Sequence, residues 1–458
     1  MTATDTPRTR GAQQPEEARH GADAERTPDA HRTIDAVWRI ESARLIAGLT
    51  RLTRDVGLAE ELAQDALVVA LEQWPVTGIP ENPGAWLMAT AKNRAIDQLR
   101  RGRMQARKHQ TLGAELEMRQ QASGGEVEAS ADDGIGDDLL RLIFIACHPV
   151  LSTEARTALT LKLLGGLTTQ EIARAFLVPE PTVAQRIVRA KRTLSEAQVP
   201  FEIPRREDLA ARLSSVLEVI YLIFNEGYAA TAGEDWMRPA LCEEALRIGR
   251  ILAELAPAEP EVHGLVALME IQASRLRART GPHGEPVLLM EQNRALWDRI
   301  LIHRGLLALA RAEALAPARG PFLLQAAIAA CHARAATVAD TDWVQITLLY
   351  DELARVMPSP VVELNRAVAV GMAYGPAAGL EIADALEREG VLKSYHLLPS
   401  VRGDFLDKLG RYAEARAQFE RAARLTHNVR EQRLLLDRAA ACAQPPGAQG
   451  APADASVQ

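Results

Sequence analysis

The sequence has few aromatic residues and almost no strand-like runs. Only 4% of its 458 residues are aromatic, and stretches of alternating Val, Ile and Thr are nearly absent, which argues against a fold built on β-sheets. Ala, Leu, Glu and Arg are abundant, and a hydrophobic content of 47% is enough to build cores. The sequence therefore predicts an all-α protein, and its length predicts about two to four domains.

Cysteines are scarce and widely separated. The four cysteines, Cys147, Cys242, Cys331 and Cys442, form no C-x-x-C spacing, which argues against the common zinc sites and favours a reducing compartment. No run approaches the ~20 apolar residues of a membrane span, and the polar first residues do not resemble a signal peptide. We therefore expect a cytoplasmic protein with no membrane partner.

Catalytic patterns are missing as well. The sequence contains no phosphate-binding loop and no cluster of metal ligands. Cys147–His148 and Cys331–His332 are adjacent pairs, and adjacent side chains on a helix diverge by about 100°, so neither pair forms a nucleophile and its base. Glu226, near Tyr228, is placed more as a helix-end hydrogen-bond partner than as an acid catalyst. We expect no enzyme, no cofactor and no metal.

Apolar periodicity and chain breaks divide the sequence into segments. Helical spacing begins near Ile34, PVTGIPENPG interrupts it, an Asp- and Glu-rich stretch interrupts it again, and VPFEIP marks a third boundary. The expected segments are a disordered start (1–30), a helical domain (31–108), an acidic linker (109–138), a second helical domain (139–198), a long helical domain (205–443) and a disordered tail (444–458).

One short stretch is strongly basic although the chain has a formal net charge of -7. On a helix, Met88, Ala91, Ala95 and Leu99 form a buried stripe with Ile96 beside it. The opposite face carries side chains suited to phosphates and base edges. The residues predicted to contact DNA here are Asn93, Arg94, Asp97, Arg100 and Arg101. Trp86, at the start of this helix, suits stacking on unpaired bases. The alternatives are a solvated charged face and a core tryptophan.

A second stretch, Gly166 to Leu194, has the pattern of a helix-turn-helix. Thr168 and Glu171 form a capping box before a short helix, FLVPE is the turn, and Pro181 suits the first position of the next helix. Val183, Ile187 and Ala190 make the inner stripe of that helix. The outer face suits a major groove, with a basic end for phosphate. The predicted DNA contacts are Thr182, Gln185, Arg186, Arg189, Lys191 and Arg192. A plain helical hairpin is the alternative.

Three stretches in this order resemble the extracytoplasmic function (ECF) sigma factors of the sigma-70 class. LAEELAQDALVVALEQW resembles the helix of that family that binds core polymerase, AWLMATAKNRAIDQLRR its minus-ten helix, and LTTQEIARAFLVPEPTVAQRIVRAKRTL its minus-thirty-five reader. The resemblance covers about residues 31–198. It implies core RNA polymerase and promoter DNA as partners, and promoter recognition and melting as the function.

The resemblance also implies particular contacts. Gln64 and Asp65 correspond to the family's polymerase-facing positions, and Glu61, Asp65 and Glu72 share one helix face. The loop Pro75–Gly84 corresponds to the part that holds a flipped base, and the acidic linker to the part that threads polymerase. Leu177 departs from the family, which usually has Gly in the turn of the helix-turn-helix. Because a left-handed backbone conformation is strained for leucine, we expect this turn to be shaped differently.

Beyond residue 205 the chain continues as helix after helix. LDKLGRYAEARAQFERAARL, Leu406 to Leu425, resembles a tetratricopeptide repeat, with Tyr412, Ala415 and Phe419 at the expected offsets. The chain thus resembles a sigma-factor subgroup with a tetratricopeptide-like extension, which implies control of the sigma module in cis. Such stacks bind proteins or peptides on a concave face, so we expect a partner of that kind.

Two functions from different classes fit these patterns. The first is a sigma factor regulated by its own extension. The second is a helical-repeat adaptor whose helix-turn-helix binds DNA independently of polymerase. The basic helix before the acidic linker favours the sigma factor, because a simple adaptor needs neither.

Overall fold

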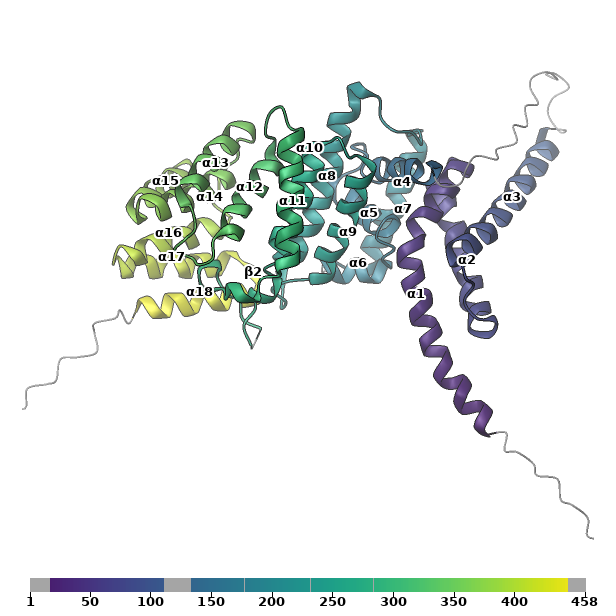
Figure 1. Cartoon of the computed structure of the whole chain (residues 1–458), viewed down its shortest axis with the longest axis horizontal. Helices are drawn as coiled ribbons and strands as arrows, with labels where there is room; N and C mark the ends of the chain where they lie inside the picture. Colours follow the sequence, from purple (N-terminus) through teal and green to yellow (C-terminus); the bar gives the residue numbers. More distant parts are fainter. Residues whose placement is uncertain (1–16, 111–132, 177, 231, 283, 444–458) are drawn as a thin grey trace, which may run out of the picture. The chain divides into compact units, whose positions relative to one another are not determined.

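The computed structural model describes residues 17–110, 133–176, 178–230, 232–282 and 284–443 (Figure 1). The chain forms two compact units. Unit 1 contains Met1–Ile145, Leu161–Leu167 and Lys191–Glu202. Unit 2 contains Ala146–Thr160, Thr168–Ala190 and Ile203–Gln458. The helical fold predicted from the sequence is confirmed, since the described residues form two strands of two residues each among many helices.

The first half of the chain forms helices α1 to α7. Their bounds are α1 Glu17–Thr53, α2 Val56–Thr77, α3 Pro83–Gln110, α4 Asp133–Ala146, α5 Thr153–Leu163, α6 Thr169–Phe176 and α7 Glu180–Glu196. Helix α1 begins inside the segment expected to be disordered, because Ala, Glu and Arg in that segment favour helix even where no apolar stripe is present. Residues 1–16 and most of the acidic linker lie outside the described residues.

The core of unit 1 is formed where α1, α2 and α3 pack together. Asp55 caps α2 by accepting a 2.8 Å hydrogen bond from the Leu58 amide, and α2 continues through Pro75 to a turn at Gly78, where φ is 87°. The buried row of α2 is Leu62, Ala66, Ala70 and Trp74. Gln73, one residue before Trp74, is exposed, because the buried residues of α2 recur every four positions.

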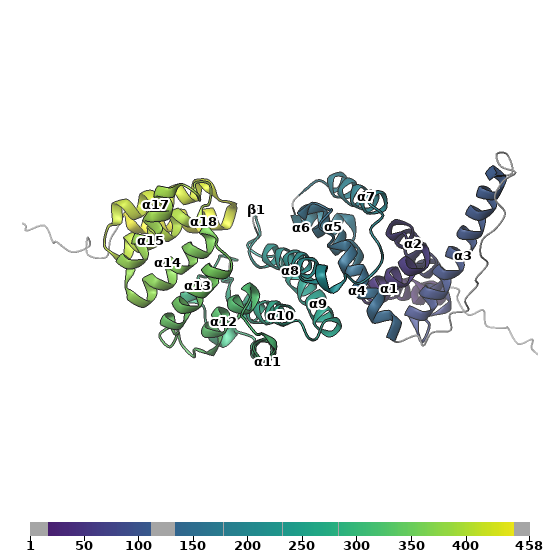
Figure 2. The same cartoon turned by 90° about the horizontal axis from the view of Figure 1, so that it is seen from above.

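The second half of the chain is a succession of helices in unit 2 (Figures 1 and 2). The α-helices are α8 Arg206–Tyr228, α9 Pro239–Leu255, α10 Pro260–Ala273, α11 Arg299–Leu315, α12 Pro321–Arg334, α13 Trp343–Val356, α14 Pro360–Tyr374, α15 Pro376–Glu389, α16 Leu397–Lys408, α17 Tyr412–Leu425 and α18 Val429–Cys442. Three short 3₁₀ helices, Leu276–Ala278, Leu289–Glu291 and Arg294–Leu296, lie between α10 and α11, and the strands are β1 Ala232–Gly233 and β2 His427–Asn428.

Prolines set where many of these helices begin. Pro239, Pro260, Pro321, Pro360 and Pro376 each occupy the first residue of a helix, where a missing N–H costs no hydrogen bond. Consecutive helices pack on one another, α8 on α9, α13 on α14, and α16 on α17. The prolines that read as breaks in the sequence are therefore the starts of successive packed helices.

The tetratricopeptide-like stretch forms the hairpin of α16 and α17. Gly410 turns the chain with φ at 74°, and Ala415, Phe419 and Ala422 are buried. Gly403 leaves room for the Phe419 ring. A helical hairpin with this burial is common to several repeat families, so the packing does not single out a tetratricopeptide repeat.

The two ends of the extension are joined through Asn428. Strand β1 pairs in parallel with β2, and the buried Asn428 amide donates to the carbonyl oxygens of Ala230 at 3.2 Å and Asp235 at 2.9 Å. Its side-chain oxygen caps α18. The contact joins segments about two hundred residues apart, which ties the first and last helices of the extension into one structure.

Candidate polymerase and DNA interfaces

The polar face of α2 is exposed at every position predicted to contact polymerase. These residues are Glu61, Gln64, Asp65 and Glu72. The Gln64 amide donates to Glu60 at 2.5 Å, and Asp65 forms a 2.9 Å ion pair with Arg94 on α3. About half of each partner in that pair is exposed, so solvent screens it and it contributes little to stability. Asp65 thus remains accessible to a partner that offers a better cation.

Helix α3 has the two faces predicted from its sequence. Leu87, Ala91 and Ala95 are buried, with Met88 half-buried beside them, while Asn93, Asp97 and Arg100 are exposed. The side chains of Leu99 and Arg101 lie outside the described residues. The exposed face therefore presents an amide, a carboxylate and guanidinium groups along one side of a helix.

Trp86 packs against a second tryptophan in the structure. It is half-buried, and its ring meets the ring of the buried Trp74 edge-on, with centroids 5.2 Å apart and planes at 66°. This edge-to-face arrangement is a favourable aromatic contact, and it fixes α3 on the end of α2. The structure therefore gives Trp86 a packing role, because its partner Trp74 completes the buried row of α2.

The helix-turn-helix forms as the capping box predicts. The Glu171 carboxylate accepts from the Thr168 amide at 2.8 Å, and the Glu171 amide donates to the Thr168 hydroxyl at 3.1 Å. The Val178 amide donates to the Ala173 carbonyl and closes α6. Leu177, the departure from the family, lies outside the described residues. Pro181 is the second residue of α7 rather than the first.

Helix α7 buries Val183, Ile187 and Ala190, as expected. On its outer side Gln185 and Arg189 are exposed, while Thr182 and Arg186 are half-buried. Arg186 lies near Glu154 on α5: the backbone amide of Glu154 and the Ser152 hydroxyl lower the pKa of that carboxyl most, and the charge of Arg186 lowers it further. Arg186 therefore has an acid nearby, although no ion pair joins the two side chains among the described contacts.

Lys191 does not present its charge to solvent as a phosphate contact would. Its ammonium is paired with Glu60, which is 5% exposed and also lies 3.6 Å from the Lys162 ammonium. Burial lowers the pKa of Lys191, with the Asp55 charge opposing that shift. Arg192, by contrast, is exposed and pairs with Glu196 on the same helix. The basic end of α7 is thus divided between a buried pair and an exposed one.

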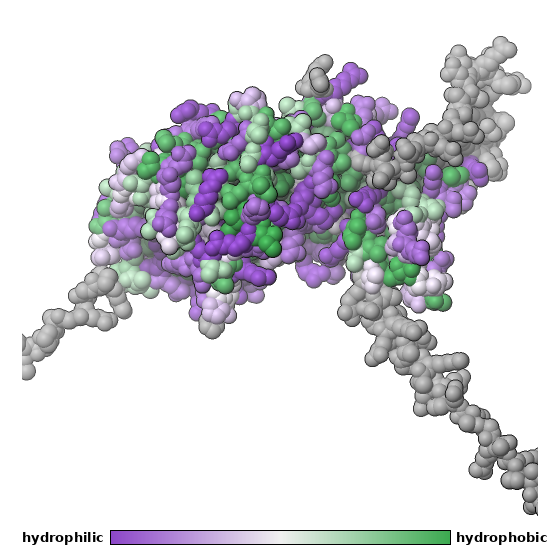
Figure 3. Space-filling model, in the orientation of Figure 1, coloured by the Kyte–Doolittle hydropathy of each residue, from purple (hydrophilic) through white to green (hydrophobic). Residues whose placement is uncertain are grey.

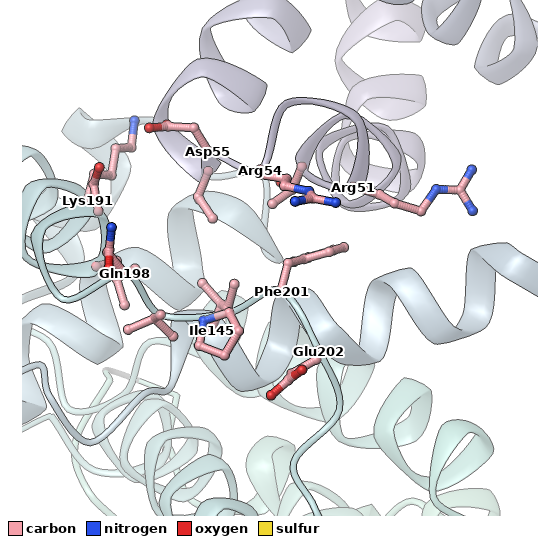
Figure 4. A pocket seen from close by; sticks show the side chains of 14 residues that line it. Arg51, Arg54, Asp55, Ile145, Lys191, Gln198, Phe201 and Glu202 are labelled. Atoms are coloured by element: carbon pink, nitrogen blue, oxygen red, sulfur yellow. The ribbon is translucent and has the colours of Figure 1, made fainter. Parts of the chain in front are cut away.

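A cavity of about 750 Å³ in unit 1 lies beside this pair (Figure 4). Its walls come from the ends of α1, α4 and α7, the start of α2 and the chain that follows α7. Figure 4 shows Lys191 beside Asp55 at its edge. Arg54 in its wall has φ at 56°, a conformation that few non-glycine residues adopt. The lining mixes acids, bases and apolar groups, and no single ligand chemistry follows from it.

Helix α8 of the extension is hydrogen-bonded to the helix-turn-helix domain through Arg156. In unit 2 the buried Arg156 guanidinium donates to the Ser215 hydroxyl and to Thr153 at 3.0 Å, and lies 3.3 Å from the Glu218 carboxylate. Ser215 in turn donates to the Cys147 carbonyl at 2.7 Å. The terminal nitrogens of Arg156 and the Cys147 carbonyl find partners on α8, so the two sequence segments form a common junction.

Burial changes the acidity of two cysteines and of a histidine beside one of them. Burial raises the pKa of Cys147 to about 11 and of Cys242 to about 12, which leaves both as unreactive thiols. Burial lowers the pKa of His148 to about 4. Glu226 forms an ion pair with Arg238.

None of the helices in the described ranges combines the length and apolar character of a membrane span.

Comparison with known proteins matches the two helical domains to the sigma-70 class. Residues 40–104 match the family model of sigma-70 region 2, residues 141–194 match that of sigma-70 region 4, and residues 212–313 match a family of unknown function (DUF6596). No solved structure matches the chain. The exposed polar faces of α2, α3 and α7, together with these matches, define a DNA-binding transcription factor of the sigma-70 class.

Individual relatives narrow the assignment. An uncharacterized protein of Rhizobium meliloti is 43% identical over 400 residues, which cover 86% of this chain and 93% of that protein. The ECF RNA polymerase sigma factor SigL of Mycobacterium tuberculosis is 31% identical over 145 residues, 31% of this chain and 76% of that protein. The probable ECF RNA polymerase sigma factor SigI of the same species is 27% identical over 170 residues, 37% of this chain and 57% of that protein. The chain belongs to the ECF RNA polymerase sigma factors, which act in transcription initiation.

Glu60→Ala is expected to destabilise unit 1 by about 3–5 kcal/mol, because it leaves two ammonium groups partly buried without a counter-charge. Glu61→Ala, one residue away on the exposed face, is the control and should stay within about 0.5 kcal/mol of the wild type. Chemical denaturation of the full chain measures both. Equal stability of the two variants would show that the buried pair contributes nothing.

Proposed function

We propose that the chain docks on core RNA polymerase through the polar face of α2, that α3 addresses the minus-ten DNA and α7 the minus-thirty-five DNA, and that the extension controls this module in cis. The observation that carries the proposal is a coincidence of positions. The two stretches matched to sigma-70 regions 2 and 4 contain α2, α3 and α7, and each of these helices keeps a polar face exposed above a buried apolar stripe at the positions predicted to bind.

The docking face on α2 consists of Glu61, Gln64, Asp65 and Glu72. Three of these are acidic in a row along one side of a helix, which suits a basic surface on polymerase. Arg94 already holds Asp65 in an exposed, exchangeable pair. A polymerase cation would replace Arg94 and release it toward DNA, which links docking to the minus-ten helix.

The minus-ten surface consists of Asn93, Arg94, Asp97 and Arg100, with Arg101 carried over from the sequence. Arg and Asn suit phosphates and base edges. Trp86 supports this surface from beneath by packing on Trp74. The expected loop Pro75–Gly84 is shorter in the structure, because α2 ends at Thr77 and α3 begins at Pro83. The chain between these helices remains the proposed holder of a flipped base, since unpairing costs least at A·T-rich sites. The acidic linker remains proposed to thread polymerase.

The minus-thirty-five surface consists of Thr182, Gln185, Arg186 and Arg189, with Arg192 at its exposed basic end. Gln185 and Arg189 are exposed, and Arg186 is half-buried with its charge near Glu154. A guanidinium suits a guanine edge because it can donate two hydrogen bonds to it. Lys191 would join this surface only if its pair with Glu60 opened.

Control by the extension is supported by the Arg156 junction. A change in the packing of α8 would be felt directly by α5, because Arg156 and Ser215 bond across the two segments. We favour a required, activating role for the extension over a masking one. Its tetratricopeptide-like hairpins and the exposed apolar residues Ile300, Leu307 and Leu348 suit a protein or peptide partner, and Figure 3 shows hydrophobic residues among hydrophilic ones on this part of the surface.

Asp65→Arg is expected to weaken binding to core polymerase by about 10-fold or more, because it places a like charge against a basic docking surface. The double variant Asp65→Arg/Arg94→Asp restores the internal ion pair with reversed sign and should still bind weakly. Affinity measured by fluorescence anisotropy with core polymerase separates the two effects. Recovery of wild-type affinity in the double variant would mean that Asp65 acts only within the chain.

Arg186→Ala is expected to relax preference at one upstream base position by about 1–3 kcal/mol, whereas loss of a phosphate contact weakens all sequences equally. Arg192→Ala serves as the comparison, since its exposed side chain is placed for phosphate. Competition binding of polymerase holoenzyme to single-base promoter variants measures the preference. A uniform loss for Arg186→Ala would reassign it to the phosphate backbone.

Arg156→Lys is expected to open the junction, because an ammonium cannot reproduce the planar, multiple hydrogen bonds of a guanidinium. Amide hydrogen exchange around Cys147 and in α8 should speed up by about 10- to 100-fold, and promoter-specific transcription should change with it. Arg174→Lys, on the exposed side of α6, is the matched control. If amide exchange became faster while transcription stayed unaltered, the junction would not take part in the control of transcription.

A further inference from the structure

The loop between α10 and α11 buries an unusual concentration of positive charge. Arg275, Arg279 and Arg294 are each 9% exposed. Among the residues that the structure describes, no carboxylate lies within ion-pair distance of any of these three guanidiniums. The charge of Asp340 acts on Arg294 from the surface, but this exposed carboxylate accepts hydrogen bonds from Thr337 and forms no ion pair with Arg294.

Aromatic rings separate these guanidiniums without neutralising them. The Arg279 guanidinium carbon lies 3.6 Å from the ring centroid of Tyr228. Arg275 and Arg294 lie 5.6 Å and 4.9 Å from the ring centroid of Trp297. Cation–π contacts hold guanidiniums in fixed planes but leave the full charge in place. The cluster is therefore rigid and strongly electropositive.

Several polar atoms around Trp297 have no hydrogen-bond partner. The Nε atoms of Arg275 and Arg294, the Trp297 indole nitrogen and the Nδ1 atom of His332 are all buried and unpartnered. Their other atoms are anchored: Arg275 donates to Tyr228 at 2.5 Å, and Arg294 donates to the backbone carbonyl oxygens of His332 and Ala335. Burial and the charges of Arg275 and Arg294 lower the pKa of His332 to about 4, so its ring is neutral at physiological pH.

We propose that Arg275, Arg294 and Trp297 form a binding site for a small oxyanion, the phosphate or carboxylate group of a metabolite. Three unpartnered donors, two of them charged, around one ring match the several acceptor oxygens of such a group. A buried charge without a counter-charge is costly, and an oxyanion supplies both the charge and the missing acceptors. Arg279 adds long-range attraction.

This site would give the extension a chemical input of its own. It lies within residues 212–313 apart from His332, so it belongs to the portion matched to a family of unknown function. The proposal does not depend on where the chain contacts polymerase or DNA, nor on whether the extension activates or masks the sigma module.

Isothermal titration of the full chain with inorganic phosphate, sulfate and acetate, against chloride at equal ionic strength, tests the proposal. We expect saturable binding near one oxyanion per chain, with the preferred probe separating phosphate from carboxylate chemistry. Arg275→Gln should weaken it by about 10- to 100-fold, since a hydrogen bond from a charged group is lost. Arg277→Gln, an exposed position in the same loop, removes equal charge and should bind as the wild type does.

Trp297→Phe keeps the ring but removes the indole donor, and it decides the matter if Arg275→Gln fails to fold. It should retain the wild-type circular dichroism spectrum and bind the preferred anion several-fold more weakly. Absence of any oxyanion binding beyond the chloride control would overturn the proposal and leave water as the partner of these donors. Undiminished binding by the folded variants would also overturn it, because the anion would then lie elsewhere.

Discussion

The hydrogen bonds of Arg156 connect the helix-turn-helix domain to the extension, and the proposed control by the extension depends on them. Arg156 is 9% exposed, and its two terminal guanidinium nitrogens donate to Ser215 and Glu218 from α8 and to Thr153 from its own helix. Ser215 completes the contact by donating to Cys147. Neither segment can be withdrawn without leaving a buried polar group unpaired, so the helix-turn-helix domain and α8 are physically continuous.

The sequence predicted the helix-turn-helix in detail because its determinants are local. The capping box lies within four residues, and the buried stripe of Val183, Ile187 and Ala190 follows from helical spacing alone. The prolines of the extension predicted chain breaks for the same reason. Features that depend only on a few neighbouring residues can be predicted without knowledge of the tertiary structure.

Features that depend on distant partners escaped prediction. The sequence pattern suggests that Lys191 is an exposed base, because its partner Glu60 lies 131 positions away in the sequence. The contact of Trp86 with Trp74 could not be predicted from the local sequence, because it depends on how α2 packs against α3. The arginine cluster around Trp297 brings together a loop and α12, and nothing in the local sequence marks its residues as buried. The closure through Asn428 likewise spans most of the extension.

The clearest test of an extension that works as part of the sigma factor is run-off transcription with core RNA polymerase on a genomic fragment library. The full chain should initiate at defined promoters, and residues 1–204 should lose most of that activity, because removal of α8 leaves Arg156 and the Cys147 carbonyl without their partners. Activity of residues 1–204 indistinguishable from that of the full chain, with and without cell extract, would contradict the account.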